Sequence, residues 1–366
     1  MNNPLQNIFF QLLRLGLWGQ GTLITDRPLS DEDWSQIYTA AVKRTVEGLI
    51  YDSFTLLPEE QLPSQSLRLK WAIRIDQIER HNSKMNTTIA MLHRMFSEAG
   101  LQPILQKGQG VANCYRIPLH RISGDIDWYF DHGGYAHARD LLKKEQLIFE
   151  DTAGFSLNYL FNSIDIEHHK KLFDIRNPFK RNYLKKIQEQ YSNHCQYLHI
   201  AEQSIRLLSP ELQLLQVNTH ILKHLITFGI GLRQFCDSAR LYHTLSSNIR
   251  PDTLKKIYQT LGILPWAHAL HYLLVKYLGL RKEELPFSYP IDLKVDWIME
   301  EVWYAGNFGY HDERFEGDKI SSLSVHPKGA NRLWTNFKRY YKYAPMEVLF
   351  YPLEQLYSSV IGIDRD

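Results

Sequence analysis

The chain has 366 residues, of which 44% are hydrophobic and 13% are aromatic. This composition is sufficient to bury a sizeable core, which excludes disorder as a description of the whole chain. The 42 Lys and Arg residues nearly balance the 40 Asp and Glu residues, and the net charge of +2 gives no case for a protein that coats nucleic acid. Cys114, Cys195 and Cys236 are too few and too widely spaced for a disulfide framework or a zinc ribbon.

The apolar stretch near the N-terminus is expected to be a helix. It lacks the preceding basic run and the small-residue cleavage site that define a signal peptide. Nowhere do about 18 apolar residues follow one another without a charge, so no membrane span is predicted. The expected location is the cytoplasm.

Residues 1–99 show the spacing of apolar residues that is typical of helices. The pattern predicts helices over residues 5–15, 31–49 and 66–99, and Gly100 is placed to end the last of them. This part of the chain is therefore expected to be helical throughout.

The pattern changes between residues 101 and 170, where short apolar runs alternate with Gly, Pro and Asp. These runs indicate a mixed sheet with at least one covering helix, near residues 135–144. The expected strands lie at residues 103–105, 126–130, 147–149 and 164–166.

Helical spacing returns from about residue 182 and continues through residues 212–243, 252–278 and 296–304. The predicted fold class is therefore α+β, with a small mixed sheet between helical flanks. The expected division is an N-terminal helical region (1–99), an α/β region (100–181) and a C-terminal helical region (182–366).

The stretch with the clearest chemistry contains Asp125 and Asp127, separated by one apolar residue. Side chains two apart in a strand share a face, so these carboxylates project together and repel each other unless a cation lies between them. Oxygen ligands of this kind suit Mg²⁺ or Mn²⁺. Asp165 and Glu167 alternate in the same way and can supply a third carboxylate from a second strand. Such a set can hold two metal ions in phosphoryl or nucleotidyl transfer.

Residues upstream of this strand suit phosphate binding. Gly108 would let backbone amides approach phosphate oxygens, and Lys107 would add a point charge. Arg121 could bind phosphate with its fork of donors, or it could neutralise Asp125 or Asp127 as a structural partner. Both alternatives stay open.

Together these motifs resemble the DNA-polymerase-β-like nucleotidyltransferase superfamily. The run Lys107-Gly108…Tyr115…Pro118…Arg121…Gly124-Asp125-Ile126-Asp127, with Leu232-Arg233-Gln234…Asp237 and Gly306-Asn307-Phe308-Gly309, resembles more narrowly a poorly characterised bacterial family of nucleotidyltransferases. The resemblance spans roughly residues 35–310. It implies that the mixed sheet is a nucleotidyltransferase palm and that an NTP, with ATP as the default, donates a nucleoside monophosphate and releases pyrophosphate.

The resemblance also implies roles for individual residues. Asp125, Asp127 and Asp165 would hold Mg²⁺ or Mn²⁺, with Glu167 as the second choice for the third acid, and these four would be the catalytic residues. The residues expected to contact the nucleotide are Lys107, Gly108, Arg121, Gly124, Arg233 and Asp237. Arg233 and Asp237 have a second interpretation as an ion pair on the surface of one helix, because they are four residues apart.

Several histidines raise the alternative of a zinc site. His168 and His169 would face opposite sides of a strand, which disfavours a shared metal. His220 and His224 share a helix face but lack the Glu of a metalloprotease motif, so packing or a place in the substrate cleft is favoured. The basic and aromatic run 338–343 could stack on nucleic acid, although a packed aromatic face with a solvated basic face is the favoured interpretation.

The acceptor is the part that the sequence leaves open. A small molecule or a protein hydroxyl is favoured over long RNA, because the net charge is balanced. Gln109 follows Gly108 where the superfamily usually has Ser or Gly, so a non-catalytic module that binds a nucleotide or a partner is the alternative function. A phosphohydrolase that uses the same acids with His168 or His169 is a third hypothesis.

Overall fold

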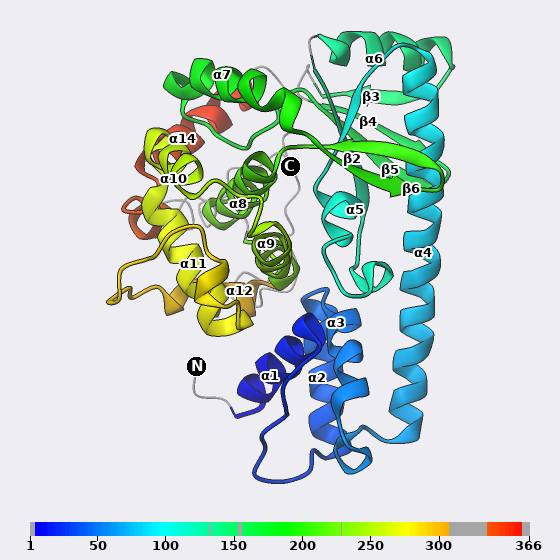
Figure 1. Ribbon diagram of the computed structural model, residues 1–366, viewed down its shortest axis with the longest axis vertical. Helices are drawn as coiled ribbons and strands as arrows, with labels where there is room; N and C mark the ends of the chain where they lie inside the picture. Colours follow the sequence, from blue (N-terminus) through cyan, green and yellow to red (C-terminus); the bar gives the residue numbers. More distant parts are fainter. Residues whose placement is uncertain (1–3, 132, 153–155, 228, 307–334, 361–366) are drawn as a thin grey trace.

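In Figure 1, a mixed sheet lies between one long helix, α4 (Gln65–Glu98), and a group of helices from the C-terminal half of the chain. The computed structural model describes residues 4–131, 133–152, 156–227, 229–306 and 335–360. The predicted combination of a mixed sheet with helical flanks is confirmed. The helices before the sheet are α1 (Pro4–Trp18), α2 (Asp31–Lys43), α3 (Glu47–Asp52) and α4 (Gln65–Glu98).

Local signals explain where the N-terminal helices begin and end. α2 starts with a capping box, in which the Ser30 hydroxyl accepts a hydrogen bond from the Asp33 backbone and the Asp33 carboxylate accepts one from the Ser30 backbone. The single helix predicted over residues 31–49 is two helices, because Thr45 adopts a φ of 54° and ends the first. The long helix α4 ends just before Gly100, whose φ is 77°, as predicted.

The sheet has seven strands in the order β3-β4-β5-β2-β1-β7-β6. β2 is parallel to β5 and β1 is parallel to β7, while the other neighbours are antiparallel. The strands are β1 (Pro103–Gln106), β2 (Asp125–Phe130), β3 (Phe149–Asp151), β4 (Ser156–Phe161), β5 (Ile164–His169), β6 (Gln196–Ile200) and β7 (Gln203–Leu207). The helices between them are α5 (Lys107–Ala112), α6 (Gly134–Lys144) and α7 (Arg181–Tyr191).

The sequence prediction of helix from residue 182 onward is wrong for β6 and β7, which extend the sheet beside β1. A two-residue turn at Ala201 and Glu202, with φ of 43° and 65°, joins these strands. A similar turn at Asn162 and Ser163 joins β4, which was not predicted, to β5. Neither turn contains glycine, so the usual Asn-Gly signal of a hairpin is absent. The division of the chain at residues 99 and 181 stays a prediction.

The two faces of the sheet have different partners. Ile126, Trp128 and Phe130 of β2 are buried in a core that includes Phe96 of α4 and Leu142 of α6. The alternate side chains of β2 and β5 point to the opposite face, because side chains alternate along a strand. The apolar face therefore anchors the sheet, and the face with the acidic residues is left for the site.

The C-terminal helices form the other wall. α8 and α9 pack against each other and against α5, and Figure 1 shows them beside the sheet. Gly262, with a φ of 77°, separates α10 from α11 within the helical pattern predicted over residues 252–278. The helices are α8 (Pro210–Ile226), α9 (Leu232–Leu245), α10 (Pro251–Leu261), α11 (Leu264–Leu278), α12 (Asp296–Ala305) and α14 (Pro345–Val360).

The basic and aromatic run 338–343 divides into two sides. Tyr340 and Tyr343 are buried, whereas Lys338 and Lys342 are exposed. Tyr341 is exposed as well, so two of the three tyrosines follow the packed and solvated arrangement that the sequence favoured over nucleic-acid binding. Asn307 of the expected Gly306–Gly309 motif lies outside the described residues, as do Phe308 and Gly309.

Candidate active site

Four acidic side chains lie on one face of the sheet, in two adjacent parallel strands. The register pairs Asp125 with Asp165 and Asp127 with Glu167. All four point to the same side, because residues two apart in a strand share a face. The two candidates for the third carboxylate therefore lie in neighbouring rows, with Glu167 in the row of Asp127.

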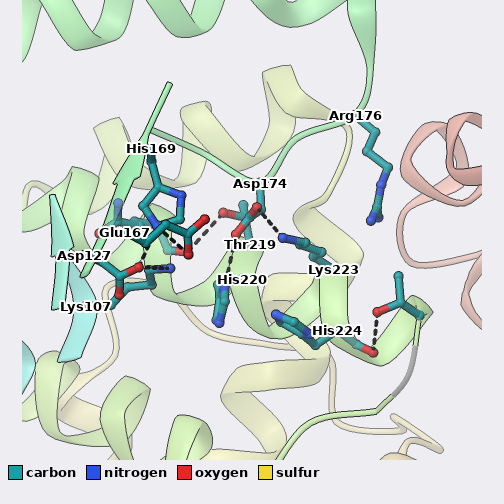
Figure 2. A network of polar contacts seen from close by, with 12 residues as sticks. Lys107, Asp127, Glu167, His169, Asp174, Arg176, Thr219, His220, Lys223 and His224 are labelled. Atoms are coloured by element: carbon teal, nitrogen blue, oxygen red, sulfur yellow. Dashed lines mark hydrogen bonds and ion pairs between the residues drawn. The ribbon is translucent and has the colours of Figure 1, made fainter. Parts of the chain in front are cut away.

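Asp127 is the centre of a compact polar cluster (Figure 2). Its side chain is only 4% exposed, and its Oδ1 lies 3.2 Å from Nζ of Lys107 and 2.5 Å from Nε2 of His169. The same Nε2 is 3.5 Å from Oε2 of Glu167. Each of Asp127, Glu167 and His169 offers one possible ligand atom, and these three atoms lie within 4.8 Å of one another. This is the spacing of a set that can hold one metal ion.

The charges of the cluster favour an ionised Asp127. Burial raises the pKa of Asp127, but the Lys107 ammonium and the hydrogen bond from His169 lower it by more, so it lies below its usual range. The charge of Asp127 is in turn the main cause that raises the pKa of Asp125. Burial lowers the pKa of Lys107, while Asp127, Asp174 and Glu167 raise it and prevail. The carboxylates therefore stabilise a positive charge at this place.

Asp125 and Asp165 lie at the start of their strands, where both are exposed. In the described part of the chain, neither belongs to the group that could hold a metal together with Asp127. The structure thus brings Glu167, and not Asp165, next to Asp127. Which of these two acids acts in catalysis stays a prediction.

Lys107 and Gly108, the first two residues of α5, form a strained turn directly after β1. Their φ angles are 40° and 37°, a region that glycine adopts readily and lysine rarely does. A Cβ atom placed on Gly108 would lie 3.5 Å from the backbone oxygen of Asp125, so the turn passes close to the start of β2. This turn holds the Lys107 ammonium beside Asp127. Strained residues of this kind cluster at functional sites.

Arg121 is a structural partner, but of a residue other than the two that the sequence suggested. It forms two hydrogen bonds with the Asp237 carboxylate, Nε to Oδ1 at 3.0 Å and Nη2 to Oδ2 at 2.6 Å, and both side chains are buried. The Tyr115 hydroxyl donates a further hydrogen bond to Asp237, at 2.7 Å. The predicted alternative of a surface ion pair between Arg233 and Asp237 is therefore wrong, because Asp237 is buried against Arg121. This network joins the loop before β2 to α9.

The charge of Arg233 interacts with those of Arg121 and Asp237 in that network and with that of Asp125 in the acidic strand. Its Nη1 donates a hydrogen bond to the backbone oxygen of Ile122 at 2.8 Å. Burial, followed by the charge of Arg121, lowers the pKa of Arg233 to about 10, while the charge of Asp125 acts to raise it. The side chain therefore remains a cation at neutral pH. Gly124 is exposed and has open space where a Cβ atom would lie.

A second polar cluster adjoins the first and comes from outside the strands. Oδ2 of Asp174 lies 3.0 Å from Nδ1 of His220, and Oδ1 lies 3.1 Å from Nζ of Lys223. The rings of His220 and His224 are in edge contact, with centroids 4.4 Å apart. Figure 2 shows this cluster, carried by α8 and the segment after β5, beside the strand carboxylates.

Sequence reasoning considered His169 only as an alternative, in a zinc site or a phosphohydrolase, and it missed Asp174. His169 follows Asp165 and Glu167 at the spacing of one strand face, and this alternation was the signal that could have identified it. His168 points to the other side, where it is fully buried and hydrogen-bonded to Tyr159. Asp174 had no such signal, because its place depends on how the segment after β5 meets α8.

The fold and the site define an α/β protein with a mixed seven-stranded sheet and a candidate cation site on one face. The chain belongs to a family of uncharacterised nucleotidyltransferases, whose sequence model matches residues 30–279. This membership supports nucleotidyl transfer in general, a reaction for which such enzymes use an NTP and divalent metal ions.

The chain is also similar to the crystal structure of an antigenic nucleotidyltransferase-like protein from Paracoccidioides brasiliensis. The two are 14% identical, with a TM-score of 0.34, and the match covers 54% of this chain and 93% of the other. No curated protein matches the chain. Every helix in the described residues is too short or too polar to cross a membrane.

Proposed function

We propose that this chain transfers a nucleoside monophosphate from an NTP to a hydroxyl acceptor and releases pyrophosphate, with the help of Mg²⁺ or Mn²⁺. The observation that carries the proposal is the cluster of Asp127, Glu167, His169 and Lys107 on one face of the sheet. The resemblance of the sequence motifs to the DNA-polymerase-β-like superfamily supports it. In that interpretation the sheet is the palm of the enzyme, and ATP is the first donor to test.

The residues present fit a divalent metal ion. Asp127, Glu167 and His169 offer two carboxylates and an imidazole within ligand spacing, and the buried carboxylate of Asp127 already attracts the Lys107 ammonium. These three residues would hold the ion. Asp125 lies on the same face of the sheet, in the neighbouring row of paired residues. A bound divalent ion would stabilise the negative charge that develops on phosphate oxygens.

Two cations of the chain would bind the triphosphate. Lys107 lies on the turn that brings the backbone close to β2, and its compact ammonium suits a phosphate oxygen. Arg233 is the second cation, and it lies close enough to Asp125 for their charges to interact. Arg121 and Asp237 would act on the nucleotide indirectly, because their charges neutralise each other in a buried ion pair.

The acceptor in this proposal is a small molecule or a protein hydroxyl. The balanced charge of the chain favours these over long RNA. The run 338–343 gives RNA little further support, since only Tyr341 of its three tyrosines is exposed.

Pyrophosphate release from each of the four NTPs, with Mg²⁺ or Mn²⁺, tests the proposal. The unaltered protein should release pyrophosphate, and the double variant Asp125→Ala/Asp127→Ala should not. Asp76→Ala is the control, because Asp76 is an exposed acid on α4. Mass spectrometry would then identify the nucleotidylated product or protein.

Two other outcomes would contradict the proposal. Inorganic phosphate in place of pyrophosphate would indicate a phosphohydrolase. NTP binding without pyrophosphate release, equal in the unaltered protein and the double variant, would indicate a non-catalytic module.

A further inference from the structure

Asp174 and His220 form a pair that neither the strand motif nor the family description explains. Asp174 follows β5, and His220 lies on α8, 46 positions further along the chain. Oδ2 of Asp174 is 3.0 Å from Nδ1 of His220. The side chains are 29% and 17% exposed, so the pair is largely removed from solvent without being sealed from it.

The geometry fixes which nitrogen of His220 carries the proton. Lys223 and His220 hold the pKa of Asp174 well below its usual range against the opposing effect of burial, so this carboxylate is ionised and only accepts hydrogen bonds. Nδ1 of His220 must therefore donate, which leaves the lone pair on Nε2. Within the described residues, Nε2 has no hydrogen-bond partner.

The pair adjoins the candidate cation site. The positive charge that His220 carries when protonated contributes to the low pKa of Asp127, and the charge of Lys107 contributes to the low pKa of His220. Asp174 also raises the pKa of Lys107, by less than Asp127 does and by more than Glu167 does. These groups interact because they lie close together, as Figure 2 shows. The pair therefore approaches the reaction centre from α8, the wall opposite the strands.

We propose that His220 is the catalytic base that accepts the proton of the acceptor hydroxyl, and that Asp174 is the positioning residue that holds its ring in the reactive tautomer. This inference rests on the proposed function. His169 is a poorer choice for the base, because its Nε2 already contacts Asp127 and Glu167.

The proton and the electron pairs balance in this step. Nε2 of His220 takes the proton of the acceptor hydroxyl, and the oxygen forms a bond to the α-phosphorus of the NTP. The bond between the α-phosphorus and the oxygen that leads to the β-phosphate breaks, and its electron pair leaves with pyrophosphate. Asp174 stabilises the imidazolium, which then returns its proton to solvent.

The surroundings of His220 keep it neutral and ready to accept a proton. Burial and the charge of Lys107 lower its pKa to about 4, Asp174 opposes this, and Lys223 adds a smaller lowering. His224, the neighbour one turn along α8, has its own pKa held low by burial. A bound triphosphate would offset the charge of Lys107 and raise the pKa of His220 towards neutrality, where a general base works best.

The experiment measures pyrophosphate release with Mn²⁺, the best NTP donor and no added acceptor, so that water is the probe acceptor. His220→Ala should lose about 100-fold or more in kcat, while the Kd for the NTP changes by less than about threefold. Exogenous imidazole should restore part of the activity of His220→Ala and none of that of Asp127→Asn. His220→Gln is a second variant that keeps a hydrogen-bonding group beside Asp174, and His224→Gln is the matched control on the same helix face.

Asp174→Asn provides a readout that a purely structural role would not give. Loss of the carboxylate destabilises the imidazolium, so the acidic limb of the pH–rate profile should move to lower pH. A limb that stays in place would overturn the role of Asp174.

The outcomes separate this inference from the proposed function. Full activity of His220→Ala, with Asp127→Asn inactive, would overturn the inference alone. Absence of pyrophosphate release from the unaltered protein would overturn the proposed function, and the inference with it.

Discussion

The buried ion pair between Arg121 and Asp237 allows a quantitative prediction. The two side chains are 6% and 5% exposed and form a two-pronged contact at 3.0 and 2.6 Å. Replacing Asp237 with Leu leaves a buried guanidinium without its counter-charge and also removes the partner of the Tyr115 hydroxyl. Replacing it with Asn removes the charge but keeps one accepting oxygen.

The expected cost follows from the burial of the pair. Removing one partner of a buried ion pair costs about 3–5 kcal/mol, with Asp237→Asn near the lower value and Asp237→Leu near the upper. Unfolding entropy of about 2.1 cal/mol/K per residue over a chain of this length gives roughly 0.8 kcal/mol/K. The expected fall in Tm is therefore about 4 °C for Asp237→Asn and about 6 °C for Asp237→Leu.

Thermal unfolding followed by circular dichroism measures these shifts. Asp76→Asn is the matched control, because Asp76 pairs with Arg80 on the surface, where the two side chains are 54% and 79% exposed. That pair should cost less than about 0.5 kcal/mol. The double variant Arg121→Met/Asp237→Leu should recover much of the loss, since it leaves no buried charge. A Tm for Asp237→Leu equal to that of the control would refute this reasoning.

Three further predictions concern charge and metal binding. Burial lowers the pKa of His120, but Asp52 and Glu79 raise it by more, so its contribution to stability is complete below about pH 6.5 and is lost as the pH rises through the folded-state pKa. The Tm difference between the unaltered protein and His120→Gln should shrink from about pH 6 to about pH 8, and a difference that grows would contradict this. Lys107→Met should lower the Tm, because Asp127 loses its ammonium partner, and added Mn²⁺ should restore the Tm. A lowered Tm that Mn²⁺ leaves unchanged would count against a metal at Asp127. His169→Asp should shift the metal preference towards Mg²⁺ and away from Mn²⁺ in calorimetric titrations, because an oxygen replaces a nitrogen ligand. An unchanged ratio of the two affinities would argue against His169 as a ligand.

Much of the fold follows from patterns that are local in the sequence. The apolar spacing and Gly100 define α4, and the alternation around Asp125 and Asp127 defines β2. The strands β4, β6 and β7 escaped prediction because their turns lack glycine and because β6 and β7 lie within a part of the chain that otherwise reads as helical. β7 pairs with β1, which lies far earlier in the sequence, so this pairing depends on the packed sheet and not on any short segment.

The site likewise contains residues that local sequence patterns predict and residues that such patterns do not. The strand alternation predicts that Asp125, Asp127 and Glu167 share a face, and the register confirms this. The partner of Arg121 could not be predicted, since Asp237 comes from α9 and meets it only when the helices pack. Asp174 and His220 also meet through tertiary packing, so no spacing in the sequence indicates that they form a pair.

In the proposed reaction, this chain breaks the bond between the α- and β-phosphates of an NTP at the site around Asp127. The most direct measurement uses the same NTP labelled in separate experiments at the α- or the γ-phosphate, with Mn²⁺, for the unaltered protein and Asp127→Asn. We expect the γ label to appear in pyrophosphate and the α label in a nucleoside monophosphate or its adduct, and we expect Asp127→Asn to produce neither. Release of the γ label as inorganic phosphate, or the same products from Asp127→Asn, would contradict it.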